Sequence, residues 1–448
     1  MILCDSQLEA INKIKDFITN SDNIAFSLEG AAGTGKTTCL IEILNWLDMK
    51  ISYALTAPTH KAALVLKQIT TRDANTLHSL LALSPNIQIL DLDLRELQFV
   101  SSKVVNNIPY NGVVICDEAS MISNALYDLL IEKVSQRKSK IIFVSDSAQL
   151  LPVKQNFYSK VYQLSDSYKL TKIYRQSEKN AIGPILQKLR SQEIHNLENI
   201  SGEDGSLIVR TDLKEFLKLY IPQVQEVINT KNILYTKLLA YTNKRVNLYN
   251  QAIRKLLNYK EEYHNGEILT AYENGEYEGN RFFNSMDYII VGIPEKVTST
   301  LPEFGEVLGW NITLWDEYSK DTFNVFILSQ DNPDSLFNKL AYTIEHIRLK
   351  AIEAKKFKSR TASLYWRSYY SLINSFSSPI DLYYDNRVVR KKSFDYGYAM
   401  TVHKSQGSSY NNIFIDWRNL KMCNDNLVRR QLQYVAMSRT RKDAYVLV

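Results

Sequence analysis

A glycine-rich segment between a strand pattern and a helix pattern constrains the fold more than any other feature of this chain. The segment GAAGTGKTT follows the apolar run IAFSL and precedes the helical pattern CLIEILNWL, and it fits G-x-x-x-x-G-K-[ST] from Gly30 to Thr37. Glycines let the backbone wrap a phosphate closely, while loop amides and the helix N-terminus supply partial positive charge. The order of strand, loop and helix therefore predicts a nucleoside-phosphate site rather than an ordinary glycine turn.

Each side chain of this loop has an expected role. Lys36 is expected to reach the β- and γ-phosphates of ATP, and the Thr37 hydroxyl is expected to hold Mg²⁺. ATP and Mg²⁺ are thus the expected cofactors. The predicted cradle comprises Gly30, Ala31, Ala32, Gly33, Thr34, Gly35, Lys36, Thr37 and Thr38.

Two later strand patterns end in polar residues that can complete such a site. VVICDEAS places Asp117, expected to support Mg²⁺, beside Glu118, expected to orient or deprotonate the attacking water. The next pattern ends in VSDSAQLLPV, where Asp146 and Gln149 are placed to sense the γ-phosphate. Acidic and polar strand ends are common by themselves. Following a phosphate loop, however, they favour ATP hydrolysis.

Two arginines are candidates for stabilising the charge that develops on the transferred phosphoryl group. Arg175 lies in LTKIYRQ, and Arg439 lies in QYVAMSRTR near the end of the chain. A single arginine is more often a solvated surface charge, so their assignment depends on the surrounding motifs.

Composition sets wider limits. The 54 basic and 48 acidic residues leave a formal charge of +6, which permits nucleic-acid binding without requiring it. The cysteines form no C-x-x-C pair, so neither a zinc site nor a disulfide framework is indicated. No apolar run approaches the ~18 residues that a membrane span needs, and the N-terminus lacks a signal-peptide pattern. We expect no membrane association and a reduced, cytoplasmic setting.

Short β-branched runs alternate with helical patterns in both halves of the chain. They are IAFSLEG, ISYALTAP, GVVICDE and KIIFVSD in the first half, and KLLAYTN, NIFIDW and AYVLV later. Such alternation is typical of parallel sheets with crossover helices, so two α/β units are expected. Two segments interrupt it. Residues 81–111 are too long for a simple connection, and residues 270–392 combine strand-like pieces with the basic, aromatic stretch EHIRLKAIEAKKFKSRTASLYWRSYYSLI.

Taken in order, eight segments resemble the conserved motifs of the superfamily 1 helicases, and most closely those of the 5′-to-3′ branch, superfamily 1B, of the Dda and RecD type. An ordered set is far more specific than any one motif. The segments are GAAGTGKTT, APTHKAA, NTLHSLL, ICDEASM, SDSAQLLPV, LTKIYRQ, YAMTVHKSQG and QLQYVAMSRTR.

The resemblance implies an α/β fold with two RecA-like P-loop domains, each a parallel sheet with flanking helices, and ATP in the cleft between them. It also implies a small β-hairpin wedge inserted in the first domain and an SH3-like β-barrel inserted in the second. The implied division is 1–80 and 112–195 for the first domain, 81–111 for the wedge, 196–269 and 393–448 for the second domain, and 270–392 for the barrel insertion.

Further site residues follow from the same resemblance. Gln7 is expected to read the adenine, Arg439 to act as an arginine finger with Arg175 as its partner, and Gln406 and Gly407 to face the nucleotide cleft. The residues expected to bind DNA are Pro58, Thr59, His60, Thr76, His78, Phe99, Asn243, Thr401, His403 and Lys404.

Three departures from the family pattern stand out. Ser145-Asp146 replaces the usual Gly-Asp, and Asn284-Ser285-Met286 replaces an Asn-Gly-Gln-like turn in the barrel insertion. The wedge matches by position only.

The implied function is an ATP-dependent DNA helicase that translocates 5′-to-3′ on single-stranded DNA and unwinds duplex DNA. We expect a functional monomer acting on single-stranded and forked DNA, with single-strand-binding or replication proteins as candidate partners, in the host cytoplasm if the chain is phage-encoded. Three alternatives stay open: a translocase that displaces bound proteins with little unwinding, an RNA-directed helicase, and a decayed ATPase that only binds nucleic acid.

Overall fold

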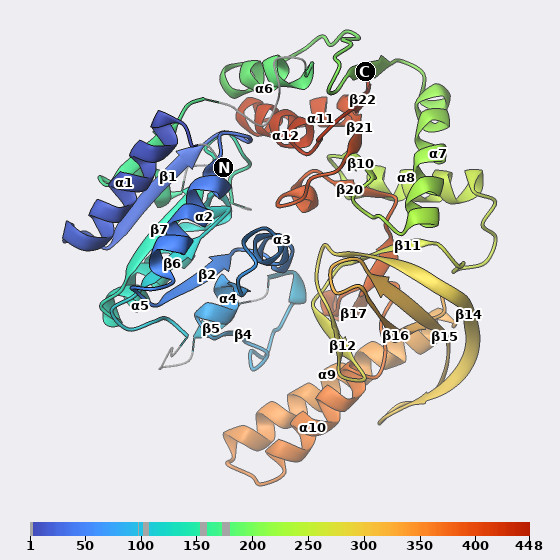
Figure 1. Ribbon diagram of the computed structural model, residues 1–448. Helices are drawn as coiled ribbons and strands as arrows, with labels where there is room; N and C mark the ends of the chain where they lie inside the picture. The colour runs from blue at the N-terminus through green and yellow to red at the C-terminus, as the bar shows by residue number, and fades with distance from the viewer. Residues whose placement is uncertain (1–2, 97, 102–106, 153–158, 173–179) are drawn as a thin grey trace.

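The computed structural model describes residues 3–96, 98–101, 107–152, 159–172 and 180–448. Figure 1 shows two parallel sheets side by side, with an antiparallel sheet and a two-helix hairpin next to the second. Within these residues, no helix is both long enough and apolar enough to cross a membrane.

The first sheet is parallel, and its strand order brings the phosphate loop beside two acidic strand ends. β1 lies next to β7, and β7 lies next to β6. Because parallel strands end at the same edge of a sheet, the segments that follow these three strands meet there. The strands in spatial order are β3 (Ala74–Thr76), β2 (Tyr53–Ala57), β6 (Val113–Cys116), β7 (Lys140–Ser145), β1 (Ala25–Gly30) and β8 (Ser167–Leu170).

Helices bury both faces of this sheet. Helices α1 and α2 share a core with Phe26 and Leu28 of β1, while α5 shares a second core with Phe143 of β7. Burial on both faces explains the nearly continuous apolar runs of the strands. The predicted α/β alternation is confirmed here, although β3 and β8 were not predicted. The helices are α1 (Asp5–Asn20), α2 (Lys36–Leu47), α3 (His60–Thr70), α4 (Leu77–Leu80) and α5 (Asn124–Gln136).

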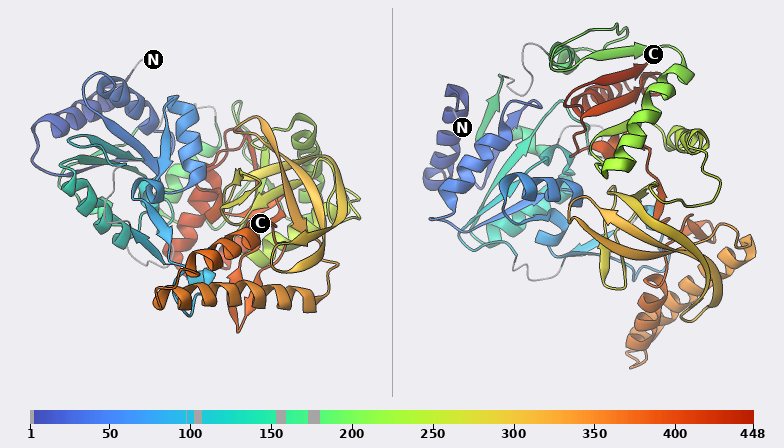
Figure 2. Two further views of the ribbon diagram at one scale, coloured as in Figure 1. Left: turned by 90° about the horizontal axis from the view of Figure 1, so that it is seen from below. Right: turned by 45° about the vertical axis from the view of Figure 1, so that its right-hand side comes forward.

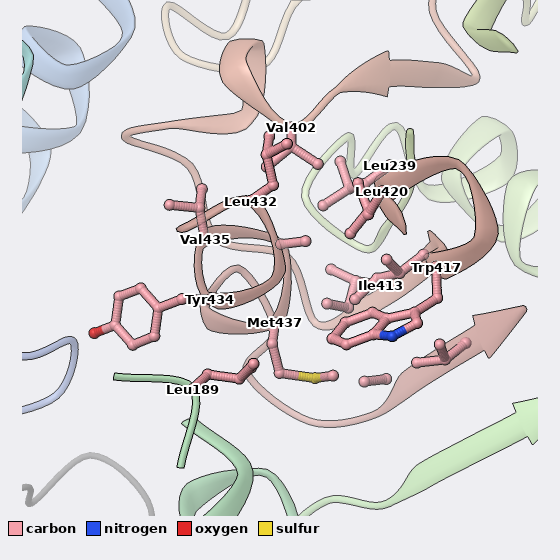
Figure 3. Packing of buried hydrophobic residues seen from close by; sticks show 14 of the residues in the cluster. Leu189, Leu239, Val402, Ile413, Trp417, Leu420, Leu432, Tyr434, Val435 and Met437 are labelled. Atoms are coloured by element: carbon pink, nitrogen blue, oxygen red, sulfur yellow. The ribbon is translucent and has the colours of Figure 1, made fainter. Parts of the chain in front are cut away.

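The second sheet is also parallel and is covered in the same way. Its strands in spatial order are β20 (Ala399–Thr401), β10 (Thr236–Ala240), β21 (Asn412–Asp416), β22 (Ala444–Leu447) and β9 (Leu207–Arg210). Helices α7 (Leu213–Thr230) and α8 (Asn243–Leu256) cover one face. Helices α6 (Ile182–Ser191), α11 (Trp417–Lys421) and α12 (Asn426–Ser438) cover the other, where Trp417, Leu432 and Met437 pack together (Figure 3).

An antiparallel sheet interrupts the second unit. Its strands in order are β16 (Asp321–Leu328), β15 (Gly305–Asp316), β14 (Asp287–Leu301), β11 (Ile268–Ala271) and β19 (Phe394–Tyr396). Two small hairpins accompany it, β12 (Gly275–Tyr277) with β13 (Asn280–Phe282), and β17 (Leu382–Tyr384) with β18 (Arg387–Arg390). Helices α9 (Asp334–Lys356) and α10 (Ala362–Ile373) form a hairpin that projects away from both parallel sheets (Figures 1 and 2). An SH3-like barrel here stays a prediction.

The insertion of the first unit is held by the α9 helix. Strands β4 (Leu83–Pro85) and β5 (Phe99–Ser101) pair antiparallel, and residues 87–90, which follow β4, lie against α9. The buried guanidinium of Arg348 donates to the carbonyl oxygens of Ile87, Ile89 and Leu90 at 2.6–2.9 Å. These bonds tie the insertion of the first unit to the helical hairpin of the second.

A buried ion pair joins the second parallel sheet to the antiparallel sheet. Lys237 Nζ on β10 lies 2.9 Å from Asp287 Oδ2 on β14, and both side chains are at most 2% exposed. Burial raises the pKa of Asp287, but the charges of Lys237 and Lys61 outweigh burial and leave that pKa below its ordinary value. Removing one partner of such a pair leaves a charge in a medium that solvates it poorly.

We expect Lys237→Met to lower the free energy of unfolding by about 3 kcal/mol, the lower end of the range for broken buried pairs, because Lys61 still faces Asp287. Urea unfolding followed by circular dichroism measures the change. The control is the triple variant Lys61→Met/Lys237→Met/Asp287→Leu, which removes all three buried charges and should regain most of the loss. A triple variant as unstable as the single one would contradict the charge explanation.

Candidate nucleotide site and nucleic-acid interface

The glycine-rich segment forms a tight loop at the end of β1. Gly33 and Gly35 have φ angles of 85° and 87°, in the left-handed region that favours glycine. A Cβ on Gly35 would lie 2.1 Å from Gln7 Nε2, so the loop also needs glycine there for space. The Lys36 ammonium donates to the carbonyl oxygens of Gly30 and Ala31 at 2.7 and 3.0 Å. The loop thus has the curled shape, with its lysine at hand, that phosphate binding requires.

A cavity of about 380 Å³ lies over this loop, and both halves of the chain line it. The first half contributes Gln7, Ala32, Gly33, Gly35, Lys36, Thr37, Thr38, Val65, Ile69, Asp117, Glu118 and Gln149. The second half contributes Gly407, Ser408, Ser409, Ser438 and Arg439. Larger cavities exist, including one of about 840 Å³ between α8 and α9, but they lack the glycine loop. The structure therefore brings most of the predicted nucleotide residues to one place.

Gln7 lies in the first turn of α1 at the edge of the cavity. Its Nε2 donates to the Thr34 carbonyl at 3.3 Å, and its Oε1 accepts from the Cys4 amide at 3.2 Å. The amide group is thereby fixed against the phosphate loop. This position suits the predicted contact with adenine, which stays a prediction.

Asp117 and Glu118 follow β6 and face the cavity. Glu118 has a φ of 52°, unusual for a side chain other than glycine, and its amide donates to Asp117 Oδ1 at 2.9 Å. Burial and the charge of Glu118 raise the pKa of Asp117 to about 6. These two neighbouring carboxylates form an acidic wall beside Lys36 and Thr37.

The residues present suit a Mg²⁺ ion that arrives with the nucleotide. Among the described residues, no group of three or more His, Cys, Asp or Glu could hold a metal without further ligands. Mg²⁺ characteristically takes one or two protein oxygens and completes its shell with water and substrate phosphates. Asp117 and Thr37 both line the cavity, so the Asp117 carboxylate and the Thr37 hydroxyl suit this role.

Asp146 connects the phosphate loop to helices of the second half. Its Oδ2 accepts from the Tyr434 hydroxyl at 2.6 Å and from the Ala32 amide at 3.1 Å. Its Oδ1 lies 3.1 Å from Arg190 Nη1. Figure 3 shows the Tyr434 ring extending out of the apolar cluster of the second unit. A single buried carboxylate therefore bonds to β7's own unit and to α6 and α12 of the other.

Sequence reasoning missed two members of this network. Tyr434 stands inside the segment QLQYVAMSRTR, but only its arginine was selected. Arg190 belongs to none of the eight motif-like segments, so no local signal pointed to it. Gln149, which was predicted as a sensor, is 5% exposed, and its Oε1 is buried without a hydrogen-bond partner. An unpartnered buried oxygen that lines the cavity is suited to accept from a bound ligand or water.

Arg439 lies at the end of α12 in the cavity wall. Its guanidinium donates to the carbonyl oxygens of Val435 and Ser408 and to the Ser438 hydroxyl at 3.0–3.3 Å. The side chain is thus held in place rather than solvated. Arg175, the other predicted arginine, lies outside the described residues.

Helix α3 of the first unit touches the second unit directly. A Cβ on Gly407, whose φ is 75°, would lie 3.2 Å from Ala62 Cβ. The buried Lys61 donates to the Ser285 carbonyl at 3.2 Å and to the Tyr410 hydroxyl at 3.4 Å. Gln406 is 7% exposed beside this contact. The segment that carries Gln406 and Gly407, which were predicted to face the nucleotide cleft, therefore packs on the helix that follows Pro58 and Thr59.

The predicted DNA contacts on the first unit fall at helix starts. Thr59 and Thr76 cap α3 and α4, and their hydroxyls accept from the amides of Ala62 and Ser79. His60 stacks on Phe283 with ring centroids 4.3 Å apart. Burial lowers the pKa of His60, so it is neutral near pH 7 and can offer a strand a hydrogen bond but no full charge.

Phe99, which was predicted to bind DNA, lies on a strand of the insertion in the first unit. Phe99 begins β5, pairs with Pro85 and is 44% exposed. Its ring meets His78 edge-on at 4.7 Å. This exposed apolar surface lies next to a predicted strand-gripping residue.

The residues of the second unit that were predicted to bind DNA differ in how exposed they are. Asn243 is exposed at the start of α8. Thr401 is 7% exposed, and its hydroxyl accepts from the Lys404 amide at 3.4 Å. His403 is partly buried near Tyr241, and burial lowers its pKa.

Lys404 differs from its prediction as a DNA ligand. Its Nζ is buried without a hydrogen-bond partner and lies 2.9 Å from the centroid of the Tyr272 ring. The physical reason is the antiparallel insertion, which supplies Tyr272 and covers the lysine. Burial lowers the pKa of Lys404 to about 7, and the charge of Lys392 adds to this effect.

A stability measurement against pH tests this burial. In the unfolded chain the lysine has a pKa of ~10.4. Above that pH the side chain is neutral in both states, so folding carries no free-energy cost for burying its charge. The cost grows as pH falls toward 7 and is constant below. We expect Lys404→Met to be more stable than the parent chain at pH 7 and the gap to close as pH rises toward 10. Thermal unfolding at several pH values measures it. Lys244→Met, at an exposed lysine on α8, is the control. If the curves of stability against pH for Lys404→Met and the parent chain stay parallel, the burial of the Lys404 ammonium is refuted.

Comparison with known proteins agrees with the architecture. Residues 3–208 match the AAA domain family, and residues 396–447 match the UvrD-like helicase C-terminal domain. The chain is 25% identical to the ATP-dependent DNA helicase dda of phage T4, over 99% of this chain and 98% of that protein. It is 33% identical to the ATP-dependent RecD2 DNA helicase of Deinococcus radiodurans, over 36% of this chain and 20% of that protein.

Solved structures share the fold. Pif1 helicase from Candida albicans aligns with a TM-score of 0.50 and 17% identity, covering 100% of this chain and 94% of that one. Pif1 helicase from Bacteroides, in complex with ADP-AlF3 and ssDNA, aligns with a TM-score of 0.51 and 15% identity, covering 99% and 92%. These similarities support the resemblance to the superfamily 1B helicases of the Dda and RecD type that the motifs indicated.

Proposed function

We propose that this chain is an ATP-dependent DNA helicase that moves 5′-to-3′ along single-stranded DNA and unwinds duplex DNA. The observation that carries the proposal is the cavity over the phosphate loop, which both halves of the chain line. A nucleotide there touches both units, so binding and hydrolysis can change how they meet. The named DNA helicases among its relatives support DNA over RNA, and the branch they represent supports the direction.

The roles of the nucleotide residues follow from their positions. Thr37 and Asp117 would hold Mg²⁺, which would neutralise charge on the phosphates. Lys36 exchanges the carbonyl oxygens of Gly30 and Ala31 for phosphate oxygens. Glu118 orients the attacking water or accepts its proton, and the free Oε1 of Gln149 accepts from the same water. Arg439, already fixed in the cavity wall, faces the developing charge.

Transmission to the nucleic acid uses the contacts between units. Asp146 joins the phosphate loop to Tyr434, and Lys61 joins α3 to the second unit. Thr59 begins α3, so a shift at either contact moves a predicted strand-gripping residue. Since one chain supplies both walls of the cavity, we propose that it acts as a monomer on single-stranded and forked DNA.

We also propose the division implied by the resemblance. The first RecA-like domain is 1–80 with 112–195, although α6 of that range packs on the second sheet. The second domain is 196–269 with 393–448. The wedge is 81–111, where β4 and β5 pair, and the SH3-like insertion is 270–392, which contains most of the antiparallel sheet. A translocase with little unwinding shares every nucleotide residue and differs only in the wedge.

Glu118→Gln should reduce ATP hydrolysis in the presence of single-stranded DNA by about 10²–10⁴-fold, the usual contribution of a general base. ATP binding should persist because the loop and Lys36 are unchanged. Phosphate release and nucleotide binding are the measurements. Glu132→Gln, at an exposed glutamate on α5, is the matched control. If single-stranded DNA does not change the rate of ATP hydrolysis by the parent chain, a decayed or non-motor ATPase is favoured instead.

Phe99→Ala should slow unwinding of a 5′-tailed duplex by about tenfold, because an aromatic contact with a base is worth ~1–3 kcal/mol. DNA-stimulated ATP hydrolysis should stay near the parent rate, since Phe99 lies outside the cavity. Strand displacement and phosphate release measure the two activities. Met49→Ala, at an apolar side chain that is 90% exposed, is the control. Unwinding at the parent rate would favour the translocase.

A further inference from the structure

The turn between α9 and α10 carries a dense positive surface. We call residues Lys355, Lys356, Phe357, Lys358 and Arg360 the basic tip. All of them are exposed, and Phe357 is 71% exposed. Lys350 and Arg367 add two more exposed charges, against the single acidic residue Glu353 between positions 350 and 367.

Local helix chemistry does not account for this surface. Lys355 and Lys356 lie in the last turn of α9, where positive charge offsets the helix dipole. Lys358 and Arg360 lie beyond that helix. In the described part of the chain, no ion pair involves any charge of the basic tip. Clustered like charges repel one another, so a compact basic cluster without ion-pair partners among the described residues points to a negatively charged ligand.

The basic tip lies beside the insertion of the first unit. Lys355 Nζ donates to Gln88 Oε1, which follows β4 in that insertion. Along the same helix, Arg348 bonds to three carbonyl oxygens of residues 87–90. Figures 1 and 2 show the hairpin projecting away from both parallel sheets on the side of β4 and β5. The basic tip and the proposed wedge are therefore held in one assembly.

We propose that the basic tip binds the phosphate backbone of the duplex ahead of the fork. This inference rests on the proposed function, because a helicase with its wedge at β4 and β5 meets the unopened duplex there. Duplex DNA presents one negative charge per ~1.7 Å of its axis, which matches a compact cluster of lysines and arginine. Phe357 supplies an apolar contact to a groove or sugar edge. Most of the predicted single-strand contacts lie elsewhere, at α3, α4, α8 and β20.

The test compares a tailed duplex with its single-stranded tail alone. The variant is Lys356→Gln/Lys358→Gln/Arg360→Gln, which spares the Lys355 bond to Gln88. The control, Lys214→Gln/Lys218→Gln/Lys231→Gln, removes the same charge from exposed lysines on and just after α7. Fluorescence anisotropy over a range of salt concentrations gives affinity and salt slope. The slope for the tailed duplex should fall by about 2 to 3, since each phosphate contact contributes ~0.9.

The same variant should bind the single-stranded tail and hydrolyse ATP with single-stranded DNA as the parent chain does. An unchanged slope on the tailed duplex overturns the inference. Equal losses on the tail alone also overturn it, because the basic tip would then grip the single strand. Polyglutamate can also bind the parent chain in competition with the duplex. If it does, and if the variant binds the duplex as tightly as the parent chain does, the inference is overturned in favour of an acidic protein partner. If DNA does not stimulate ATP hydrolysis by the parent chain, the proposed helicase function is refuted. The salt slope on the tailed duplex still tests duplex binding by the basic tip.

Discussion

The architecture depends most on the hydrogen bonds and the ion pair that the Asp146 carboxylate makes. This carboxylate accepts from the Ala32 amide in the phosphate loop and from the Tyr434 hydroxyl on α12, and it pairs with Arg190 on α6. Charge-assisted bonds of this kind are stronger than neutral ones and have defined geometry. A phosphate that draws the Ala32 amide toward itself competes with Asp146. The carboxylate therefore stands where nucleotide chemistry in one unit can change the packing of the other.

Buried charge also sets the position of the antiparallel insertion. Lys237 and Asp287 are as deeply buried as the apolar core, and Lys61 reaches the same region from the first unit. Such pairs often stabilise a protein less than apolar residues of the same volume. Their value here is that three separate elements have one arrangement that brings both ammonium groups to the single carboxylate of Asp287. Lys404 differs, since its ammonium rests on an aromatic ring.

The sequence predicted the features that a short run of neighbouring residues determines. The glycine loop, the acidic strand ends and seven apolar runs predicted the two parallel sheets, because each depends on backbone freedom or on burial of both strand faces. Strands such as β8 and β9 were missed because runs of four residues, partly polar, resemble loops. Arg190 and Tyr434 matter through contacts between distant elements. The orientation of Lys404 depends on Tyr272, which belongs to the insertion, and no local pattern contains that information.

The most direct test of the account is unwinding of two duplexes that differ only in the polarity of their single-stranded tail. With ATP and Mg²⁺, the chain should displace the strand of the duplex with a 5′ tail and leave the duplex with a 3′ tail largely intact. Without ATP, neither should open. Opening of the 3′-tailed duplex alone would contradict the direction, and opening of neither, despite DNA-stimulated hydrolysis, would contradict the helicase itself.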